Sequence, residues 1–349
     1  MKILLVSALP PPEGGIAEWT TRYLRYCEEH QIDIGLVNIA LSGARGAKFN
    51  DHTRVFDEIS RTKRVLHDMH QQLNISKPSV VHMNTSCGPF GIFRDFLCVR
   101  IAYKRHTPVV LHFHCNIESW VHGKARIWAL KKMTGMASKV LVLNSASKSF
   151  VEPYAKKPPV IVPNFISGDY CEKEHIIREI IREIVFVGHV QLTKGIREIY
   201  EAAVKLPDIH FTLVGPVADE IAILPCPKNI SLVGSKNSSE VKQYLLMADL
   251  YLLPSYTEGF SLSLTEAMAT GLPAIASDVG ANRDMLEDKG GTIIPAKSFE
   301  AILQAINHLS AKETRQEMSK WNIQKVRDKY LTETVISKII DIYKELEAD

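Results

Sequence analysis

The sequence predicts an α/β protein with two Rossmann-like domains, because a strand, a glycine-containing loop and a helix follow one another at two separate places. The first set occupies residues 2–30, where Gly14 and Gly15 separate an apolar strand from a helix. The second set occupies residues 184–206, where a loop that begins at Gly188 stands between the strand and the helix. Such loops are typical of anion-binding turns in parallel α/β sheets. A length of 349 residues is sufficient for two domains of this kind.

The rest of the chain continues the alternation of short apolar runs and amphipathic segments. Further strands are predicted at residues 32–39, 79–83, 109–112, 140–143, 160–162, 210–214, 229–233, 249–253, 274–276 and 293–295. Further helices are predicted at residues 52–73, 91–105, 122–139, 217–224, 238–247, 262–270, 299–309, 312–330 and 332–347. The charged stretch 167–183 lies between the two sets of elements and is interpreted as the connection between the domains.

The composition is that of an ordinary globular protein, with 46% hydrophobic and 23% charged residues. No apolar run reaches the roughly 18 residues of a membrane span. The first eight residues predict a strand rather than a signal peptide. The six cysteines are scattered without a C-x-x-C pair, which argues for a reducing compartment and against a structural zinc site. We therefore expect a cytoplasmic location.

The charge is distributed unevenly along the chain. Residues 1–166 hold 22 Lys/Arg and 12 Asp/Glu, a net charge of +10, whereas residues 167–349 hold 20 and 27, a net charge of −7. A basic half indicates an anionic partner, such as membrane headgroups, a phosphorylated acceptor or nucleic acid. No nucleic-acid motif accompanies the basic residues, so nucleic acid ranks last and is not expected as a partner.

Two segments of the basic half are ambiguous on their pattern alone. His112 and His114 stand at i and i+2 at the carboxyl end of a strand, the edge at which parallel sheets bind ligands. Such a pair could ligate a metal, but no third or fourth ligand stands at a suitable spacing, so no metal is expected. The basic helix 122–139 either buries Trp128, Met133 and Met136 in the core or rests on anionic lipid.

The stretch 254–273 carries the strongest signal in the sequence. An apolar strand is followed by a glycine turn at 258–261 and by a segment of good helix formers at 262–270. The amides at a helix start are unpaired and carry partial positive charge, so they suit an anionic or hydroxyl-rich ligand. Glu258 and Glu266 could accept hydrogen bonds from two parts of one polyhydroxy ligand. Alternatively, Glu258 is a loop charge and Glu266 faces solvent.

This stretch resembles the Glu-x7-Glu signature of the retaining GT-B glycosyltransferases of family 4, the group 1 glycosyltransferases. The pattern Ser-x-x-Glu-Gly-Phe followed by Glu-Ala-Met-Ala-x-Gly-x-Pro is matched almost residue for residue. The resemblance implies that Glu258 holds hydroxyls of the donor sugar and that Glu266 holds the ribose of the nucleotide. The other donor-binding residues that it implies here are Gly259, Phe260, Ser261 and Leu262. The family usually has Gly at position 261, so a side chain is expected near the donor.

Two other segments match the same family. Gly14-Gly15-Ile16 resembles its glycine loop, whose amides approach the donor diphosphate. Residues 188–195 resemble its Gly-Arg-x-x-x-x-Lys-Gly element, which implies that Lys194 neutralises the diphosphate. The base of the nucleotide is implied to lie against the backbone near Gly215 and Val233.

Three histidines complete the comparison with the family. His114 takes the place of the active-site histidine beside the transferred sugar, and the implied catalytic residues are therefore His114, Lys194 and Glu258. His112 stands where the family often has Thr. His189, next to Gly188, stands where the family usually has Arg. Because a histidine is only partly charged near neutral pH, either diphosphate binding is weaker here or it strengthens as the pH falls.

The resemblance implies a metal-independent retaining hexosyltransferase with the GT-B fold, in which two Rossmann-like domains face each other across a cleft. Residues 1–166 are the expected acceptor-side domain, residues 167–331 the expected nucleotide-sugar-binding domain, and the helix 332–349 is expected to pack back on the first. The donor is expected to be a UDP-sugar, with a GDP-sugar as the alternative. The acceptor is expected to be a hydroxyl of a glycan or a lipid-linked precursor, as in polysaccharide biosynthesis. No cofactor is implied, since the nucleotide sugar is a substrate.

Other functions share this architecture. A nucleotide-sugar epimerase does not need the pair of glutamates, and a sugar phosphorylase normally uses a pyridoxal cofactor. A catalytically weak binding protein is the third alternative, which the departures at His189 and Ser261 keep open. The chain contains no Asp-x-Asp sequence, which disfavours the metal-dependent glycosyltransferase fold. The basic first domain suggests peripheral attachment to the inner face of the plasma membrane.

Overall fold

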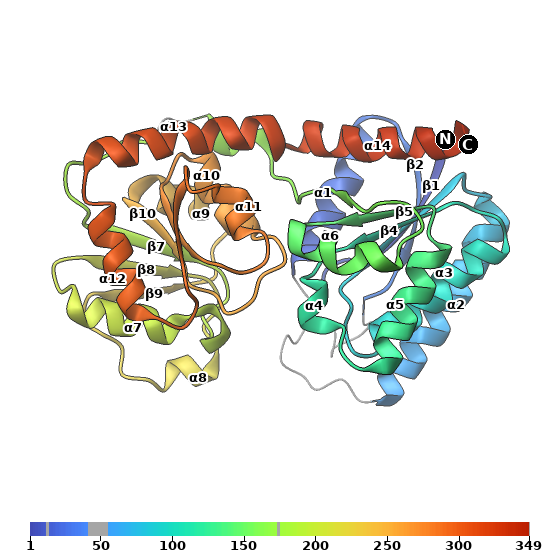
Figure 1. The fold of residues 1–349 in the computed structure, drawn as a ribbon, viewed down its shortest axis with the longest axis horizontal. Coiled ribbons are helices and arrows are strands. Elements are labelled where there is room, and N and C mark those ends of the chain that lie inside the picture. The colour runs from blue at the N-terminus through green and yellow to red at the C-terminus, as the bar shows by residue number, and fades with distance from the viewer. Residues whose placement is uncertain (12–13, 41–54, 173–174, 349) are drawn as a thin grey trace. The chain divides into compact units, whose positions relative to one another are not determined.

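The computed structural model describes residues 1–11, 14–40, 55–172 and 175–348, which form two compact units (Figure 1). Unit 1 consists of Met1–Asn164 together with Val335–Asp349, and unit 2 consists of Phe165–Thr334. Each unit has helices around a parallel six-stranded sheet. The α/β class that the sequence predicts is thereby confirmed. The predicted loop before the first helix and the start of the helix predicted at 52–73 fall partly outside the described residues.

The sheet of unit 1 is parallel at every pair of neighbouring strands. Its strands are β1 (Lys2–Ser7), β2 (Asp33–Asn38), β3 (Val80–Thr85), β4 (Val109–Phe113), β5 (Lys139–Val142) and β6 (Val160–Ile161). The spatial order β2-β1-β3-β4-β5-β6 reverses direction between β1 and β3. Ligands of open parallel sheets bind at the carboxyl edge near such a reversal. The ends of β1 and β3 are therefore the expected binding edge of this unit.

Eight helical segments of unit 1 lie in the part of the chain that the structure describes. They are α1 (Gly15–Glu29), α2 (Val55–Ser76), α3 (Gly91–Lys104), α4 (Ile117–Trp120), α5 (Lys124–Met136), α6 (Ser145–Val151), the 3-10 turn η1 (Glu152–Tyr154) and most of α14 (Thr332–Ala348). The last helix of the chain thus lies in the same unit as the first strand, far from it in sequence.

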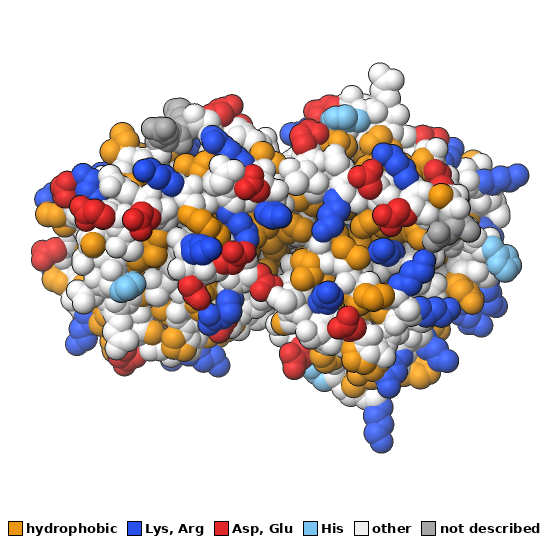
Figure 2. Space-filling model, turned by 45° about the horizontal axis from the view of Figure 1, so that its top comes forward, with side chains coloured by type: hydrophobic (Ala, Val, Ile, Leu, Met, Phe, Trp, Pro, Cys, Tyr) orange, Lys and Arg blue, Asp and Glu red, His pale blue; other side chains and the backbone are white. Residues whose placement is uncertain are grey.

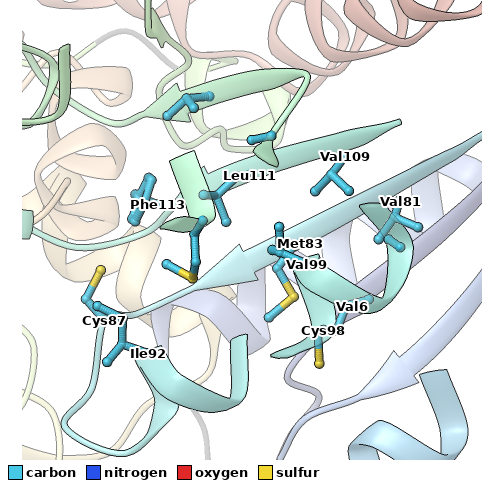
Figure 3. Packing of buried hydrophobic residues seen from close by; sticks show 14 of the residues in the cluster. Val6, Val81, Met83, Cys87, Ile92, Cys98, Val99, Val109, Leu111 and Phe113 are labelled. Carbon is cyan, nitrogen blue, oxygen red and sulfur yellow. The ribbon is translucent and has the colours of Figure 1, made fainter. Parts of the chain in front are cut away.

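One face of the unit 1 sheet is apolar. Successive side chains of a strand point to opposite faces, so alternate residues share an environment. Leu111 and Phe113 of β4 and Met83 of β3 lie in one buried cluster with Cys98 and Val99 of α3 (Figure 3). The same cluster includes side chains of α2 and α5, so these three helices cover this face.

The opposite face buries polar side chains. His82 and Asn84 of β3 and His112 of β4 are the alternate residues of their strands, and all three are completely buried. Trp19 of α1 and Tyr343 of α14 both make ring contacts with His82, at centroid distances of 5.6 and 5.7 Å. The helices α1 and α14 therefore cover this second face, and a polar network lies beneath them.

Helix α5 has one buried and one exposed face. Met133 is completely buried in the core, whereas Trp128 is 48% exposed, with its ring 5.1 Å from that of Phe96. Of the residues predicted for the core, Met133 therefore lies there, whereas Trp128 lies at the surface. Among the described residues, no helix is both long enough and apolar enough to cross a membrane.

Unit 2 repeats the architecture with a different strand order. Its strands are β7 (Glu183–Val187), β8 (His210–Val214), β9 (Ile230–Gly234), β10 (Leu250–Leu253), β11 (Ala274–Ser277) and β12 (Gly291–Ile294). Its helices are η2 (Gly168–Cys171), η3 (Leu192–Lys194), α7 (Ile196–Lys205), α8 (Asp219–Ala222), α9 (Ser238–Met247), α10 (Leu262–Ala269), α11 (Asn282–Leu286), α12 (Phe299–His308) and α13 (Lys312–Lys329). The order β12-β11-β10-β7-β8-β9 reverses direction between β7 and β10. The carboxyl ends of these two strands are the expected binding edge.

Candidate active site

Two glycines bring the ends of β7 and β8 together. The backbone N–H of Gly188 donates to Val214 O at 2.9 Å. Gly215 has a φ of +142°, and a Cβ at this position would lie only 1.9 Å from Gly188 O. Only glycine is compatible with this conformation and this close approach. No side chain at position 215 therefore stands between the two strand ends.

The position of Lys194 is determined by a close approach between the backbone of Gly195 and that of Pro254. It ends the short turn η3, and the next residue, Gly195, is left-handed with a φ of +74°. A Cβ at Gly195 would lie 2.3 Å from Pro254 O, which follows β10. The start of α7 is therefore fixed directly against the end of β10, across the reversal in strand order.

Lys194 and Glu258 form an ion pair in which Nζ lies 2.6 Å from Oε1. The lysine side chain is 24% exposed and the glutamate side chain 11% exposed, so the pair is largely but not fully removed from water. The backbone N–H of Tyr256 donates to Thr193 O at 2.9 Å, which ties the two loops together beside the pair. Glu258 is therefore not an isolated loop charge.

The turn that carries Glu258 is also held from the other side. Gly280 has a φ of +57°, and a Cβ there would lie 2.2 Å from Glu258 O. The next residue, Ala281, donates its backbone N–H to Gly259 O at 3.1 Å. Contacts from two other loops thus determine where the Glu258 backbone lies.

Ser261 caps the helix α10. Its Oγ accepts a hydrogen bond from the backbone N–H of Leu264 at 3.2 Å, and its side chain is buried. Serine is a favoured N-cap because its hydroxyl satisfies one of the unpaired amides of the first turn. Phe260, also buried, lies edge-to-face against Tyr330 at 5.4 Å. The departure from Gly at position 261 therefore has a local structural role in starting the helix at Leu262.

Glu266 lies one turn further along α10 and is only 9% exposed. The alternative in which it faces solvent is therefore wrong. Both acids lie close enough to Tyr251 of β10 to affect its titration. The pKa of Tyr251 is raised first by burial and then by the charges of Glu258 and Glu266. The Tyr251 hydroxyl donates to Ser263 Oγ at 2.7 Å. The two glutamates therefore share one neighbourhood at the end of β10, as the sequence motif requires.

The remaining predicted donor-binding residues of unit 2 lie at the carboxyl ends of three strands. Gly188 and His189 follow β7, Gly215 follows β8, and Val233 is next to last in β9. Gly215 N donates to Gly234 O at 2.9 Å, directly after Val233 in β9. His189 follows Gly188, and the next residue, Val190, donates to Pro216 O at 2.9 Å. The structure thus brings together backbone from three adjacent strands.

In unit 1, Gly14 and Gly15 form an open helix start. Gly14 is the N-cap of α1, and Glu18 N donates to its carbonyl oxygen at 2.9 Å. A Cβ added to either glycine would meet no described heavy atom within 4 Å. The remaining amides of the first turn have no intrahelical partner, as at any helix start.

His114 follows β4 and belongs to the polar face of the sheet. Its Nε2 lies 3.0 Å from Asn84 Oδ1, and its ring lies 4.1 Å from that of His112 and 5.1 Å from that of Trp19. Burial, followed by the charge of His82, lowers the pKa of His114 to about 3. The imidazole of His114 is therefore neutral at physiological pH.

Sequence reasoning did not assign roles to several polar residues around His114. Ser7, Thr20 and Asn84 are completely buried and hydrogen-bonded to one another beside it. The alternation along β1, β3 and β4 carried a signal, because Ser7, Asn84 and His112 are polar residues within otherwise apolar runs. Among the described residues, no group of three or more His, Cys, Asp or Glu is arranged to hold a metal ion.

Residues 172–325 match the family model described as Glycosyl transferases group 1. This segment lies within unit 2 and contains Lys194, Glu258 and Glu266. The putative teichuronic acid biosynthesis glycosyltransferase TuaC of Bacillus subtilis (strain 168) is 29% identical over 221 residues, which cover 59% of this chain and 56% of that relative. The N-acetyl-alpha-D-glucosaminyl L-malate synthase of Bacillus anthracis is 27% identical over 51% of this chain and 49% of its own. The chain thus spans about half the length of the curated relatives that it matches.

The fold also matches solved structures over the whole chain. Sucrose-phosphate synthase from Thermosynechococcus elongatus superimposes with a TM-score of 0.80 at 15% identity, covering 99% of each chain. At this identity the likeness concerns the fold alone, which is the GT-B fold that the sequence predicts. Residues 172–325 are thus similar in sequence to the group 1 glycosyl transferases.

Proposed function

We propose that the protein is a retaining glycosyltransferase that moves a sugar from a nucleotide-diphosphate sugar to a hydroxyl of an acceptor. The observation that carries this proposal is the arrangement at the carboxyl ends of β7 and β10. There the Lys194–Glu258 ion pair, the start of α10 and the buried Glu266 meet within the segment that matches the family. A cation, the amides of a helix start and two acids suit a ligand that has both phosphates and hydroxyls.

The charge and hydrogen-bonding groups of the site residues in unit 2 define the role that we propose for each. Lys194 stabilises the negative charge of the departing diphosphate, which is the main catalytic contribution. Glu258 accepts hydrogen bonds from hydroxyls of the donor sugar, and the amides of 259–262 contribute their partial positive charge. Glu266 accepts hydrogen bonds from the ribose. The base lies along the backbone near Gly215 and Val233, where no side chain at 215 obstructs it.

The leaving group takes part in the proposed reaction itself. The bond between the anomeric carbon and the phosphate oxygen breaks while the acceptor oxygen attacks from the same face of the sugar. The acceptor proton passes to an oxygen of the departing phosphate, so no carboxylate nucleophile is required. Lys194 supplies the positive charge that the diphosphate needs, and we therefore propose that neither a metal ion nor another cofactor is required.

Unit 1 provides the remaining proposed residues. The open helix start at Gly14 and Gly15 suits the diphosphate, because its amides lack intrahelical partners. His114, neutral at physiological pH, suits a sugar hydroxyl, since a neutral imidazole can accept a hydrogen bond through one nitrogen and donate through the other.

We further propose that unit 1 contacts an anionic membrane surface that carries a glycan or lipid-linked acceptor. Figure 2 shows that Lys and Arg side chains, in blue, are more widespread than acidic side chains over unit 1 in this view. A hollow of about 520 Å³ is lined by Lys104, Lys156 and Lys157 at the amino edge of the sheet. Trp128 is exposed on the nearby basic helix α5. Basic residues and an exposed aromatic ring on the same unit suit the interface of anionic lipid.

The donor is tested by calorimetric titration with UDP, GDP and ADP in the absence of metal. We expect the wild-type protein to prefer UDP, and Glu266→Ala to weaken that binding by about 10- to 100-fold, because a hydrogen bond to a charged group is lost. Glu317→Ala, an exposed glutamate of α13, is the matched control and should bind like the wild type. If none of the three nucleotides binds, the proposal is wrong.

Turnover separates a transferase from the other functions of the same architecture. Release of UDP from a UDP-sugar, with transfer to an acceptor that preserves the anomeric configuration, is the expected result. Nucleotide binding without turnover would favour a binding protein.

Flotation with anionic liposomes at low salt tests the membrane contact, and a protein that stays at the bottom would contradict it.

A further inference from the structure

Three adjacent strands of unit 1 bring polar side chains to one edge of the sheet. Ser7 ends β1, Asn84 is next to last in β3, and His114 follows β4; these strands are neighbours in the sheet. All three residues belong to the face that α1 covers. Thr20 of α1 reaches this edge, with its Oγ1 2.6 Å from Ser7 Oγ.

Donor and acceptor can be assigned in only one way for each hydrogen bond along this edge. Thr20 Oγ1 lies 2.7 Å from Ile16 O, and a carbonyl oxygen can only accept, so the threonine proton points there. Ser7 must therefore donate its own proton to Thr20 Oγ1. Ser7 Oγ then accepts from the Asn84 amide, whose Nδ2 lies 2.9 Å away.

The direction of this chain decides the protonation of the histidine. Because Asn84 directs its NH₂ group to Ser7, its Oδ1 faces His114 Nε2 at 3.0 Å. An amide oxygen can only accept, so His114 Nε2 must carry the hydrogen. The neutral imidazole then has its lone pair on Nδ1.

We propose that Asn84 is a positioning residue, which holds His114 as the Nε2–H tautomer and so leaves Nδ1 as the hydrogen-bond acceptor of a ring that Asn164 also contacts. This inference rests on the proposed function for the part that His114 plays beside the transferred sugar. The assignment of the tautomer does not, because it follows from the chain of contacts alone.

The hydrogen bonds that hold the His114 tautomer are protected from water. Ser7, Thr20 and Asn84 are completely buried, so water does not compete for their hydrogen bonds. The chain ends at Ile16 O in the first turn of α1, directly after Gly14 and Gly15. The same hydrogen bonds therefore connect His114 to the helix start proposed for the diphosphate, and fix the two groups relative to each other within unit 1.

A second set of contacts on the same face provides a matched control. Tyr343 of α14 hydrogen-bonds His82 Nδ1, and His82 Nε2 lies 3.3 Å from His112 Nδ1. These residues are as deeply buried as the first set, but no hydrogen bond joins Tyr343 to Asn84 or to His114 Nε2 among the described contacts. Tyr343→Phe therefore removes a buried hydroxyl from the same face of the sheet and leaves the hydrogen bonds of Asn84 to Ser7 and to His114 in place.

The test is the tautomer of His114, read from long-range proton–nitrogen correlation spectra of the full-length protein labelled at histidine. The variant His114→Gln identifies the signals. In the wild type at pH 7 we expect the Nε2–H pattern, with more than about tenfold preference over the other tautomer. Asn84→Leu should reduce this preference to comparable populations and lower kcat by about 10- to 100-fold with a smaller change in KM. Tyr343→Phe should leave the His114 signals unchanged.

Asn84→Asp keeps the acceptor and adds a charge. It should retain the Nε2–H bond, stabilise the imidazolium, and bring the titration of His114 into the range accessible between pH 5 and 8. The pH profile of kcat should follow this titration, whereas an unchanged profile would mean that His114 takes no part in turnover. If Asn84→Leu does not fold, Ser7→Ala provides the weaker version of the same change.

Two results would overturn the inference. The first is an Nδ1–H pattern in the wild type, and the second is an unchanged His114 spectrum in a folded Asn84→Leu protein. If the tautomer is as expected but no nucleotide sugar is turned over, the proposed function fails and the positioning by Asn84 stands.

Discussion

Lys194 Nζ lies 2.6 Å from Glu258 Oε1, although the two residues are separated by 64 positions in the chain. In the proposed function one of them contacts the diphosphate and the other contacts the sugar. Their contact therefore joins the two chemical halves of the donor site. The Gly195–Pro254 approach and the Tyr256–Thr193 hydrogen bond keep the two loops together even without this ion pair.

We predict that Lys194→Met lowers kcat by about 100- to 1000-fold, because the variant loses the charge that stabilises the leaving diphosphate. Lys194→Arg should retain more activity than Lys194→Met, since its charge is preserved. Initial rates of UDP release measure the effect. Lys205→Met, an exposed lysine at the end of α7, is the matched control. Equal rates for Lys194→Met and wild type would remove this residue from the mechanism.

We predict that Gly215→Ala destabilises unit 2 by about 2 to 4 kcal/mol. The new Cβ would lie 1.9 Å from Gly188 O, and the φ of +142° is unfavourable for alanine. Urea unfolding followed by circular dichroism measures the loss. Gly168→Ala is the control, because a Cβ there would meet no described atom within 4 Å. Equal stability of the two variants would show that the strand ends can separate at little cost.

The buried histidines predict a loss of stability as the pH falls below about 6.5. Burial lowers the pKa of His82 and of His114 to about 3, whereas an unfolded histidine has a pKa of about 6.5. Between these values the unfolded state binds more protons than the folded state, so the free energy of unfolding decreases with falling pH. Each histidine contributes at most about 1.4 kcal/mol per pH unit in this window.

This pH effect can be measured from urea unfolding at pH 7.5, 6.5 and 5.5. The titratable groups that face His82 include Tyr23, Tyr343, His112 and His114, none of which carries a compensating negative charge at these pH values. His82→Gln should have lower stability at pH 7.5 and a shallower dependence on pH. His308→Gln, on the exposed side of α12, should have the wild-type slope. If His82→Gln leaves the dependence of the unfolding free energy on pH unchanged, His82 is not its cause.

We predict that His189→Arg tightens UDP binding by about 5- to 10-fold at pH 8. Arginine is always charged and can contact a phosphate through two N–H groups, whereas a histidine is mostly neutral at that pH when its environment is ordinary. Calorimetric titration at pH 8 and pH 6 tests the prediction, with a smaller gain expected at pH 6. Unchanged affinity at both values would mean that this side chain does not contact the diphosphate.

Local patterns in the sequence were sufficient for the elements and for the motif around α10. The alternation of apolar runs with amphipathic helices predicted both parallel sheets, because periods of 2 and 3.6 residues are properties of neighbouring residues. The glycine turn at 258–261 and the helix formers of 262–270 predicted the turn and the helix in the same way. The sequence could not decide whether Glu266 faced solvent, because burial depends on what packs against α10. The same limit applied to α5, where Met133 is buried and Trp128 is exposed.

The sequence by itself therefore determined the α/β class, the two domains and the residue types of the candidate site. Only the tertiary structure decided which of those residues meet. Lys194 and Glu258 pair because the strand order places β7 beside β10, and Asn84 reaches Ser7 and His114 because β3 lies between β1 and β4. Strand order is set by the packing of helices from distant parts of the chain onto each sheet. No local period encodes it, and for that reason the ion pair and the hydrogen-bond chain became visible only in the folded protein.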